Sequence, residues 1–154
     1  DGIRDVAVTG VQTCALPIFT IIPATPGLSL SIYYIFISIM EINLKSKPFT
    51  IKVVHEKNDL ANGMMGKTFD GFDGMLFMMP QSGPQSFWMK NCLIALDIIF
   101  LDRDKITNIS HSCPPCDGED CPTYQGHGGF VLELPGGTCK DLGIKIGDRI
   151  DYGI

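Results

Sequence analysis

The sequence predicts one mainly β domain of the α+β class, a compact, partly closed β-barrel or sandwich with two short helices. After Met40, short apolar runs are separated by Gly, Pro and Asp, which is typical of many short strands. One run, residues 96–102, is apolar on both faces, so the strand that it predicts must be covered on both sides. Two short segments carry the signals of helix ends.

In the first half of this domain, residues 49–55 alternate between apolar and polar side chains and predict a strand. Residues 57–66 predict a short helix, capped by Asn58 or Asp59. The elements expected next are a turn at 71–74, a strand at 75–79, a loop at 80–85 and a strand at 86–90.

The second half begins with the apolar strand 96–102. Its side chains divide between two faces: Leu96, Ile98 and Phe100 on one, Ile99 and Leu101 on the other. A polar turn at 102–105 leads into residues 105–111, so a hairpin is expected. The elements expected after it are a loop at 112–129, a strand at 130–134, a helical turn capped by Thr138 and ended by Gly143, and a last strand at 147–152.

The N-terminal part of the chain is expected to lie outside this domain. Residues 8–18, VTGVQTCALPI, resemble a sequencing-library adapter translated in frame, and DGIRD fits the adapter's next constant block, so we interpret residues 1–18 as an adapter-derived artefact. Residues 19–40 are uncharged and apolar. They predict either a membrane segment or translated upstream DNA, with a start at Met40 slightly favoured. The single β-rich domain is then residues 41–154.

The charge of the chain bears on its partners. The formal net charge is −5 and no basic run is present, which argues against nucleic acid because phosphate binding needs clustered Lys and Arg. The expected partner is therefore a small molecule or a protein, and a membrane only if residues 19–40 are an anchor. These residues and the cysteines leave the compartment open, with a cytoplasmic location slightly favoured over an exported or membrane-anchored one.

The stretch GMLFMMPQSGPQSFWMKNCLIALDIIFLD closely resembles a small prokaryotic and phage family known as domain of unknown function 192. GMM at 63–65, PPC with CPTY, and FVLELPGGT followed by LGIKIGDRI fit the same family, so the resemblance spans about Phe49 to Tyr152. It implies a β-rich fold and no established activity. The departures from the family pattern are Cys92 in place of Thr, Ala95 in place of Pro, Lys67 shifted by one position, and Cys113 beside the family pair Cys116 and Cys121.

The segment from His111 to His127 is the richest in reactive side chains. Cys113, Cys116, Cys121 and His127 have the spacing Cys-x2-Cys-x4-Cys-x5-His and could hold zinc. The alternatives are a structural disulfide between Cys116 and Cys121, simple free thiols, and redox chemistry. Thioredoxin-like activity is the least favoured, because two prolines separate Cys113 from Cys116 and no helix start follows to lower a thiol pKa.

A second candidate site lies around the motif FWMKN. On a strand Trp88 and Lys90 share one face, so an aromatic ring and the donors of Lys90 and Asn91 could form a ligand site. Asp97 begins the two-faced strand and needs a partner, for which Lys90 is the expected choice. Glu133, in an apolar strand, is a weaker member of the same set. A buried ion pair, or turn hydrogen bonds that hold the barrel together, is favoured over acid–base chemistry for Asp97 and Lys90.

Other chemistries find less support. The methionines, six of them within residues 64–89, could suit Cu(I), but their strand spacing favours core packing. Neither a Ser-His-Asp order nor a nucleotide-binding Gly loop is found, so the function predicted is a ligand- or protein-binding accessory module centred on FWMKN. The alternatives are a zinc-stabilised Cys/His loop module, with zinc as the cofactor, and an enzyme that uses Asp97 and Lys90.

Overall fold

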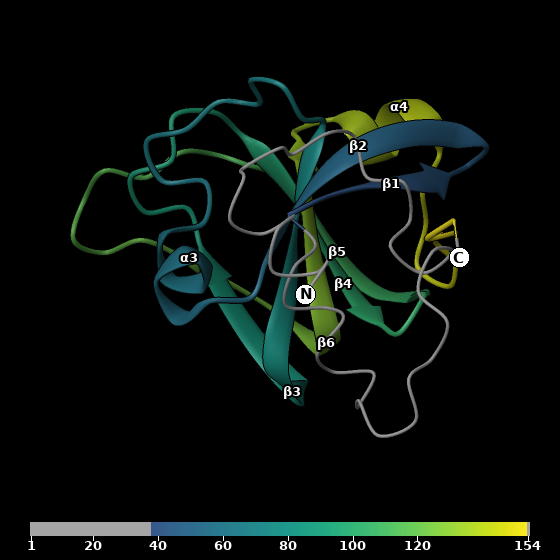
Figure 1. Cartoon of the computed structure of the whole chain (residues 1–154). Helices are drawn as coiled ribbons and strands as arrows, with labels where there is room; N and C mark the ends of the chain where they lie inside the picture. Colours follow the sequence, from purple (N-terminus) through teal and green to yellow (C-terminus); the bar gives the residue numbers. More distant parts are fainter. Residues whose placement is uncertain (1–37, 154) are drawn as a thin grey trace, which may run out of the picture.

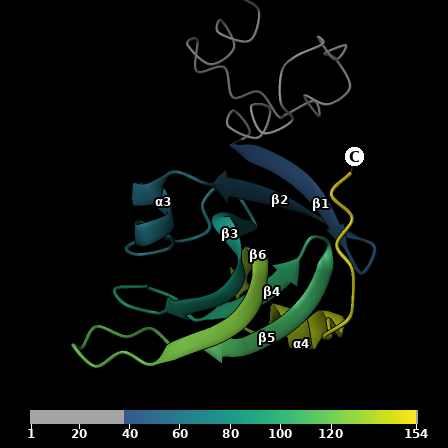
Figure 2. The ribbon, with the colours of Figure 1, turned by 90° about the horizontal axis from the view of Figure 1, so that it is seen from below.

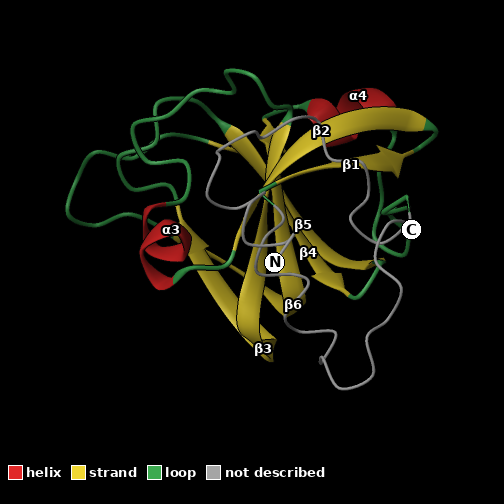
Figure 3. Ribbon diagram, viewed as in Figure 1, coloured by secondary structure: helices red, strands yellow, loops and turns green. Residues whose placement is uncertain are grey.

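A computed structural model describes residues 38–153. The adapter-like segment and residues 19–37 of the apolar leader lie outside the described residues. Strands make up most of the described chain, as Figure 3 shows, and the predicted mainly β class is confirmed. The elements are β1 (Ile39–Leu44), β2 (Lys47–Val54), α3 (Lys57–Asn62), β3 (Gly74–Trp88), β4 (Leu96–Asp102), β5 (Lys105–Cys113), β6 (Thr123–Pro135) and α4 (Thr138–Leu142).

The six strands form one sheet in the order β1-β2-β3-β6-β4-β5 (Figure 1). Strands β2 and β3 are parallel, and every other neighbouring pair is antiparallel. The parallel pair needs a crossover connection, and α3 lies in it. The sheet does not close on itself, so β1 and β5 are its two edge strands.

The segment after α4 contacts both edge strands. Asn43 of β1 and Asp151 exchange two backbone hydrogen bonds of 2.7 and 2.9 Å, and Lys105 of β5 forms a bridge with Arg149. Figure 2 shows this C-terminal segment passing from α4 towards β1. The strand predicted at 147–152 is wrong, because each of its pairings stops after a single bridge. The segment nevertheless links the open edges of the sheet, which explains the partly barrel-like shape.

Strand β4 has the predicted bounds and the predicted two-faced character. Leu96, Ile98 and Phe100 belong to one hydrophobic cluster, which also contains Met64, Met75, Phe77, Met89 and Val131. Ile99 and Leu101 belong to a second cluster with Ile42, Ile51, Leu132, Ile144 and Ile150. Each of the two clusters thus covers one face of β4. Met64, Met75 and Met89 are buried, which agrees with their interpretation as core residues.

Two predicted loops are parts of strands. Residues 80–85 lie within β3, where a register shift between Met78 and Gly83 accommodates the prolines and glycine that had suggested a loop. Residues 123–129 belong to β6, although Gly126, Gly128 and Gly129 are turn-like in sequence. A Cβ atom at Gly126 would strike the Phe100 ring, and one at Gly128 would strike the Leu101 backbone. These two glycines allow β6 to approach β4 closely.

The helices are shorter than predicted or begin elsewhere. α3 ends at Asn62, and its N-cap is Glu56, without a side-chain cap, rather than Asn58 or Asp59. α4 begins at Thr138 with Gly137 as its N-cap, and Gly143 ends it as predicted. The first strand, β1, was not predicted at all. Among the described residues, no helix has the length and apolar character needed to cross a membrane.

Candidate functional site

Strand β3 ends in the residues that the sequence marks as a binding surface. Met89 is fully buried, whereas 46% of Trp88 is exposed, so the predicted alternation of faces is present. The Lys90 ammonium lies 5.9 Å from the centre of the Trp88 ring, a distance at which a cation is attracted to the aromatic face. Leu93, a few residues further on, is 59% exposed. The end of β3 therefore presents an exposed aromatic ring beside one cation.

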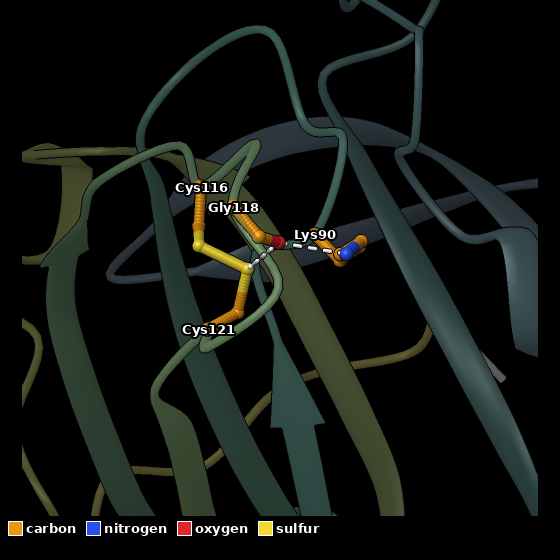
Figure 4. Close-up of a disulfide and its surroundings, with 4 residues drawn as sticks. All are labelled: Lys90, Cys116, Gly118 and Cys121. Atoms are coloured by element: carbon orange, nitrogen blue, oxygen red, sulfur yellow. Dashed lines mark hydrogen bonds between the residues drawn. A yellow bond between two sulfur atoms is a disulfide. The ribbon is translucent and has the colours of Figure 1, made fainter.

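A disulfide-closed loop lies beside this surface (Figure 4). Cys116 and Cys121 are joined, with their Cα atoms 5.8 Å apart. The Lys90 ammonium donates a 2.7 Å hydrogen bond to the Gly118 carbonyl inside the loop. Asn91, which has a φ of 55°, donates its backbone N–H to the Cys116 carbonyl at 2.8 Å. The loop is thus attached to the end of β3 by its backbone and through the Lys90 side chain.

The disulfide bears on the zinc prediction. Of the alternatives open for Cys116 and Cys121, the structure contains the disulfide, and in this form neither sulfur is available as a thiolate ligand. His127 lies on β6, in register with Pro84 of β3, and Cys113 is a buried free cysteine. The zinc hypothesis for Cys113, Cys116, Cys121 and His127 therefore stays a prediction for a reduced chain.

Asp97 has a different partner from the one predicted. It is fully buried, and its carboxylate accepts hydrogen bonds from the backbone N–H groups of Ser112 (2.7 Å), Gly137 (3.1 Å) and Cys139 (2.7 Å). The expected pairing with Lys90 is wrong, since Lys90 donates to Gly118. Asp97 instead ties together the end of β5, the turn after β6 and the start of α4. Nothing in this arrangement places an ammonium beside the carboxylate for acid–base work.

Glu133, on β6, is the second buried carboxyl group. It is only 4% exposed and lies opposite Met75 of β3 and Ile98 of β4. Within the described part of the chain its Oε2 atom has no hydrogen-bond partner. Burial raises the pKa of Glu133 to about 8, because the charged form loses its hydration. At neutral pH the group is therefore mostly a neutral acid inside an apolar cluster.

Within residues 38–153 three cysteines are free, and the protein environment makes their thiols harder to ionise. Burial, with a smaller contribution from the Glu133 charge, raises the pKa of the half-buried Cys92 to about 11. Burial and the charge of Asp97 raise the pKa of Cys113 to about 11 and that of Cys139 still further. None of them resembles the activated thiolate of a cysteine nucleophile.

Sequence reasoning did not connect one further group of residues. Asp97, His111 and Cys139 place their ligand atoms within 4.8 Å of one another, and they form the only such group of three or more among residues 38–153. They come from β4, β5 and α4, so no spacing along the chain could have revealed the group. Leu96, at the start of β4, pairs with Cys113 at the end of β5 and with Pro135 at the end of β6. These three strand ends therefore lie together, which brings Asp97, His111 and Cys139 close to one another.

Comparisons with known proteins agree with this fold. A crystal structure from Novosphingobium aromaticivorans DSM 12444, described as a protein of unknown function, is similar at 30% identity and a TM-score of 0.63, over 74% of this chain and 85% of that one. A crystal structure from Sinorhizobium meliloti 1021, described as a proposed transcription regulator, is similar at 27% identity and a TM-score of 0.63, over 75% of this chain and 92% of that one.

No curated protein matches the chain. The model of one family, described as DUF192, Uncharacterized ACR, matches residues 39–152. That match includes every strand and both helices of the described structure. The chain therefore belongs to the DUF192 family.

Proposed function

We propose that this domain is a protein-binding module whose contact surface is centred on Trp88 and Lys90, with the disulfide loop as its rim. The observation that carries the proposal is the half-exposed Trp88 ring with the Lys90 ammonium held beside it. Tryptophan is among the residues that most often contribute the binding energy of protein interfaces. Covering the exposed part of this ring, roughly 100 Å², would contribute about 2 kcal/mol to binding.

The surface is rigid before any partner arrives, which favours binding. Lys90 is held by its hydrogen bond to Gly118, and the loop that carries Gly118 is closed by the disulfide. The Cys116 backbone N–H also donates to the Met89 carbonyl at 3.1 Å. Groups that are already ordered lose little conformational entropy on association.

The charges near the surface indicate the kind of partner. The loop that holds Gly118 carries Asp117, Glu119 and Asp120, all exposed, and the whole chain has a net charge of −5. Trp88 adds an exposed apolar ring. A segment with basic and apolar side chains would therefore complement this surface better than an acidic one.

The description of the Sinorhizobium protein as a proposed transcription regulator suggests a contrasting function, direct binding to DNA. The charge of the present chain does not favour it, because a net charge of −5 opposes phosphate binding. The acidic loop beside Trp88 would repel a nucleic acid backbone in the same way. A protein partner remains the better match to these residues.

The proposal can be tested by fluorescence, because Trp88 is the only tryptophan of the chain. The probes are two synthetic peptides with the same leucine and phenylalanine content, one rich in lysine and one rich in glutamate. The lysine-rich peptide should shift the Trp88 emission to shorter wavelength and protect it from acrylamide quenching at low salt. The glutamate-rich peptide should do neither. Equal behaviour of the two peptides, or no protection with either, would contradict the proposed surface.

Variants show whether Lys90 takes part. Lys90→Met should raise the affinity for the lysine-rich peptide, because it removes a like charge beside Trp88. Lys140→Met, at an exposed position on α4, should leave the affinity unchanged. An equal change in both variants would mean that the peptide responds only to the overall charge.

The disulfide gives a further prediction. Replacing both Cys116 and Cys121 with Ser should lower the free energy of unfolding in urea by about 2 kcal/mol, the loop-closure effect expected for so short a loop. The affinity for the lysine-rich peptide should fall as well, because the acidic loop that carries Asp117, Glu119 and Asp120 would no longer be closed by the disulfide. An unchanged affinity at reduced stability would show that the loop has a structural role only.

A further inference from the structure

The three side chains Asp97, His111 and Cys139 meet where the start of β4, the end of β5 and the turn after β6 lie together. Their oxygen, nitrogen and sulfur ligand atoms all lie within 4.8 Å of one another. Three zinc ligands around one ion lie about 3.3–3.8 Å apart, since zinc–ligand bonds are about 2.0–2.3 Å long. The exposed His111 is the side chain that can rotate to bring the three onto one ion.

We propose that Asp97, His111 and Cys139 form a binding site for a zinc-like divalent cation. Zinc accepts a carboxylate oxygen, an imidazole nitrogen and a thiolate sulfur, and sites with three protein ligands leave a fourth position for water. The mixed donor set suits zinc better than magnesium or calcium, which bind oxygen almost alone.

The state of Asp97 is the first argument for a cation. Its carboxylate is fully buried, and no ion pair within residues 38–153 includes it. Its partners are three backbone N–H groups, which leave further lone pairs on the two oxygens. The same three hydrogen bonds fix the orientation of the carboxylate, as the supporting hydrogen bonds around protein metal ligands do.

The second argument concerns Cys139 and His111. The Cys139 backbone N–H donates to the Asp97 carboxylate, and the Cys139 sulfur lies within 4.8 Å of a carboxylate oxygen, so the two ligand atoms are close before any ion binds. On binding, the S–H bond breaks, a metal–sulfur bond forms, and the proton leaves to solvent without any change in oxidation state. Cys139 is fully buried, whereas His111 is exposed. The imidazole therefore provides the side from which an ion can enter.

This site is separate from the proposed protein-binding surface and from the cysteine loop. It shares no residue with Trp88, Lys90 or the Cys116–Cys121 disulfide. It would therefore persist whether or not a partner binds at Trp88, and failure of one proposal leaves the other standing.

The test is a titration of the full chain with Co²⁺, purified without reductant so that the disulfide stays closed. Thiolate ligation produces an intense near-ultraviolet charge-transfer band, and Zn²⁺ should abolish it by displacing the cobalt. One equivalent of metal should bind. His111→Ala, at an exposed position, and Cys139→Ala should each weaken binding at least about tenfold. His127→Ala, the other exposed histidine at the end of the cysteine loop, is the matched control and should bind normally.

The possible outcomes separate the two metal hypotheses. No band at millimolar Co²⁺, or a band that persists in His111→Ala, would overturn the proposed site. A band lost in His127→Ala would also overturn it, because the metal would then be bound through His127. Should Cys139→Ala fail to fold, as judged by circular dichroism, the charge-transfer band together with the His111→Ala result still decides the question.

Discussion

Asp97 and Glu133 are buried carboxyl groups on neighbouring strands, yet their environments differ. Asp97 accepts three backbone hydrogen bonds. Glu133 leaves one oxygen without a partner, and burial raises its pKa to about 8. The comparison shows that burial alone does not decide the role of an acidic residue. Backbone N–H groups stabilise a charged carboxylate, whereas an apolar cluster favours the neutral acid.

The largest expected effect is at Asp97. Asp97→Asn places an NH₂ group where one of the backbone donors now points, and it removes the charge that strengthens all three bonds. The free energy of unfolding should fall by about 3–5 kcal/mol, measured by urea denaturation. Asp102→Asn, at the exposed end of the same strand, is the control and should change it by less than about 0.5 kcal/mol. If Asp97→Asn lowers the free energy of unfolding no more than Asp102→Asn does, the backbone hydrogen bonds of Asp97 do not stabilise the fold as proposed. Asp97 and Glu133 would then not differ in this respect.

The next effect is the pH dependence that Glu133 should produce. Its pKa rises from 4.5 in the unfolded chain to about 8 in the folded protein, so between these values the folded protein holds more protons. Stability should therefore decrease as the pH rises from about 5 to 8, by up to about 4 kcal/mol, and level off above. The lowered pKa values of Asp104 and Asp148 act only near pH 3.8 and below, outside this range.

Glu133→Gln is the matched variant for this measurement. Because the amide does not titrate, the stability of the variant should be almost independent of pH between 5 and 8. If wild type and variant show parallel stability profiles between pH 5 and 8, burial does not raise the pKa of Glu133, and the contrast with Asp97 fails.

The smallest effect concerns the thiol of Cys92. The negative charge of Glu133 contributes to its raised pKa, while Lys67 lowers it. Glu133→Gln should therefore speed the reaction of Cys92 with iodoacetamide above pH 8 by about twofold. Peptide mass mapping would identify the labelled cysteine, and the fully buried Cys139 serves as the internal control. An unchanged rate would mean that the two groups are not electrostatically coupled.

The sequence predicted those strands whose burial is visible in the run of apolar residues itself, and it missed features that depend on tertiary contacts. The strand Leu96–Asp102 was predicted with its bounds because continuous apolar character reports burial on both faces. Residues 80–85 and 123–129 were mistaken for loops because their prolines and glycines serve a bulge and a close approach of two strands, which only the tertiary structure reveals. Strand β1 was missed because its first residues continue the apolar leader.

In the candidate site, too, the sequence predicted some features and missed others. The exposure of Trp88 and the burial of Met89 follow from strand alternation. The partners of Asp97 do not, because they are backbone N–H groups that lie 15, 40 and 42 residues further along the chain. Lys90 was predicted as the partner of Asp97 because a sequence shows which side chains are charged but not where backbone N–H groups point. The group of Asp97, His111 and Cys139 escaped notice for the same reason.

The pairing of Asn43 with Asp151 has a consequence for synthesis on the ribosome. Until residues 148–151 have emerged, a nascent chain carries β1 and β5 with their outer backbone groups unpaired. Exposed strand edges of this kind pair readily with other chains. Correct closure therefore waits until the segment after α4 has been translated, and a ribosome that stalls before residues 148–151 would hold the domain with both strand edges open.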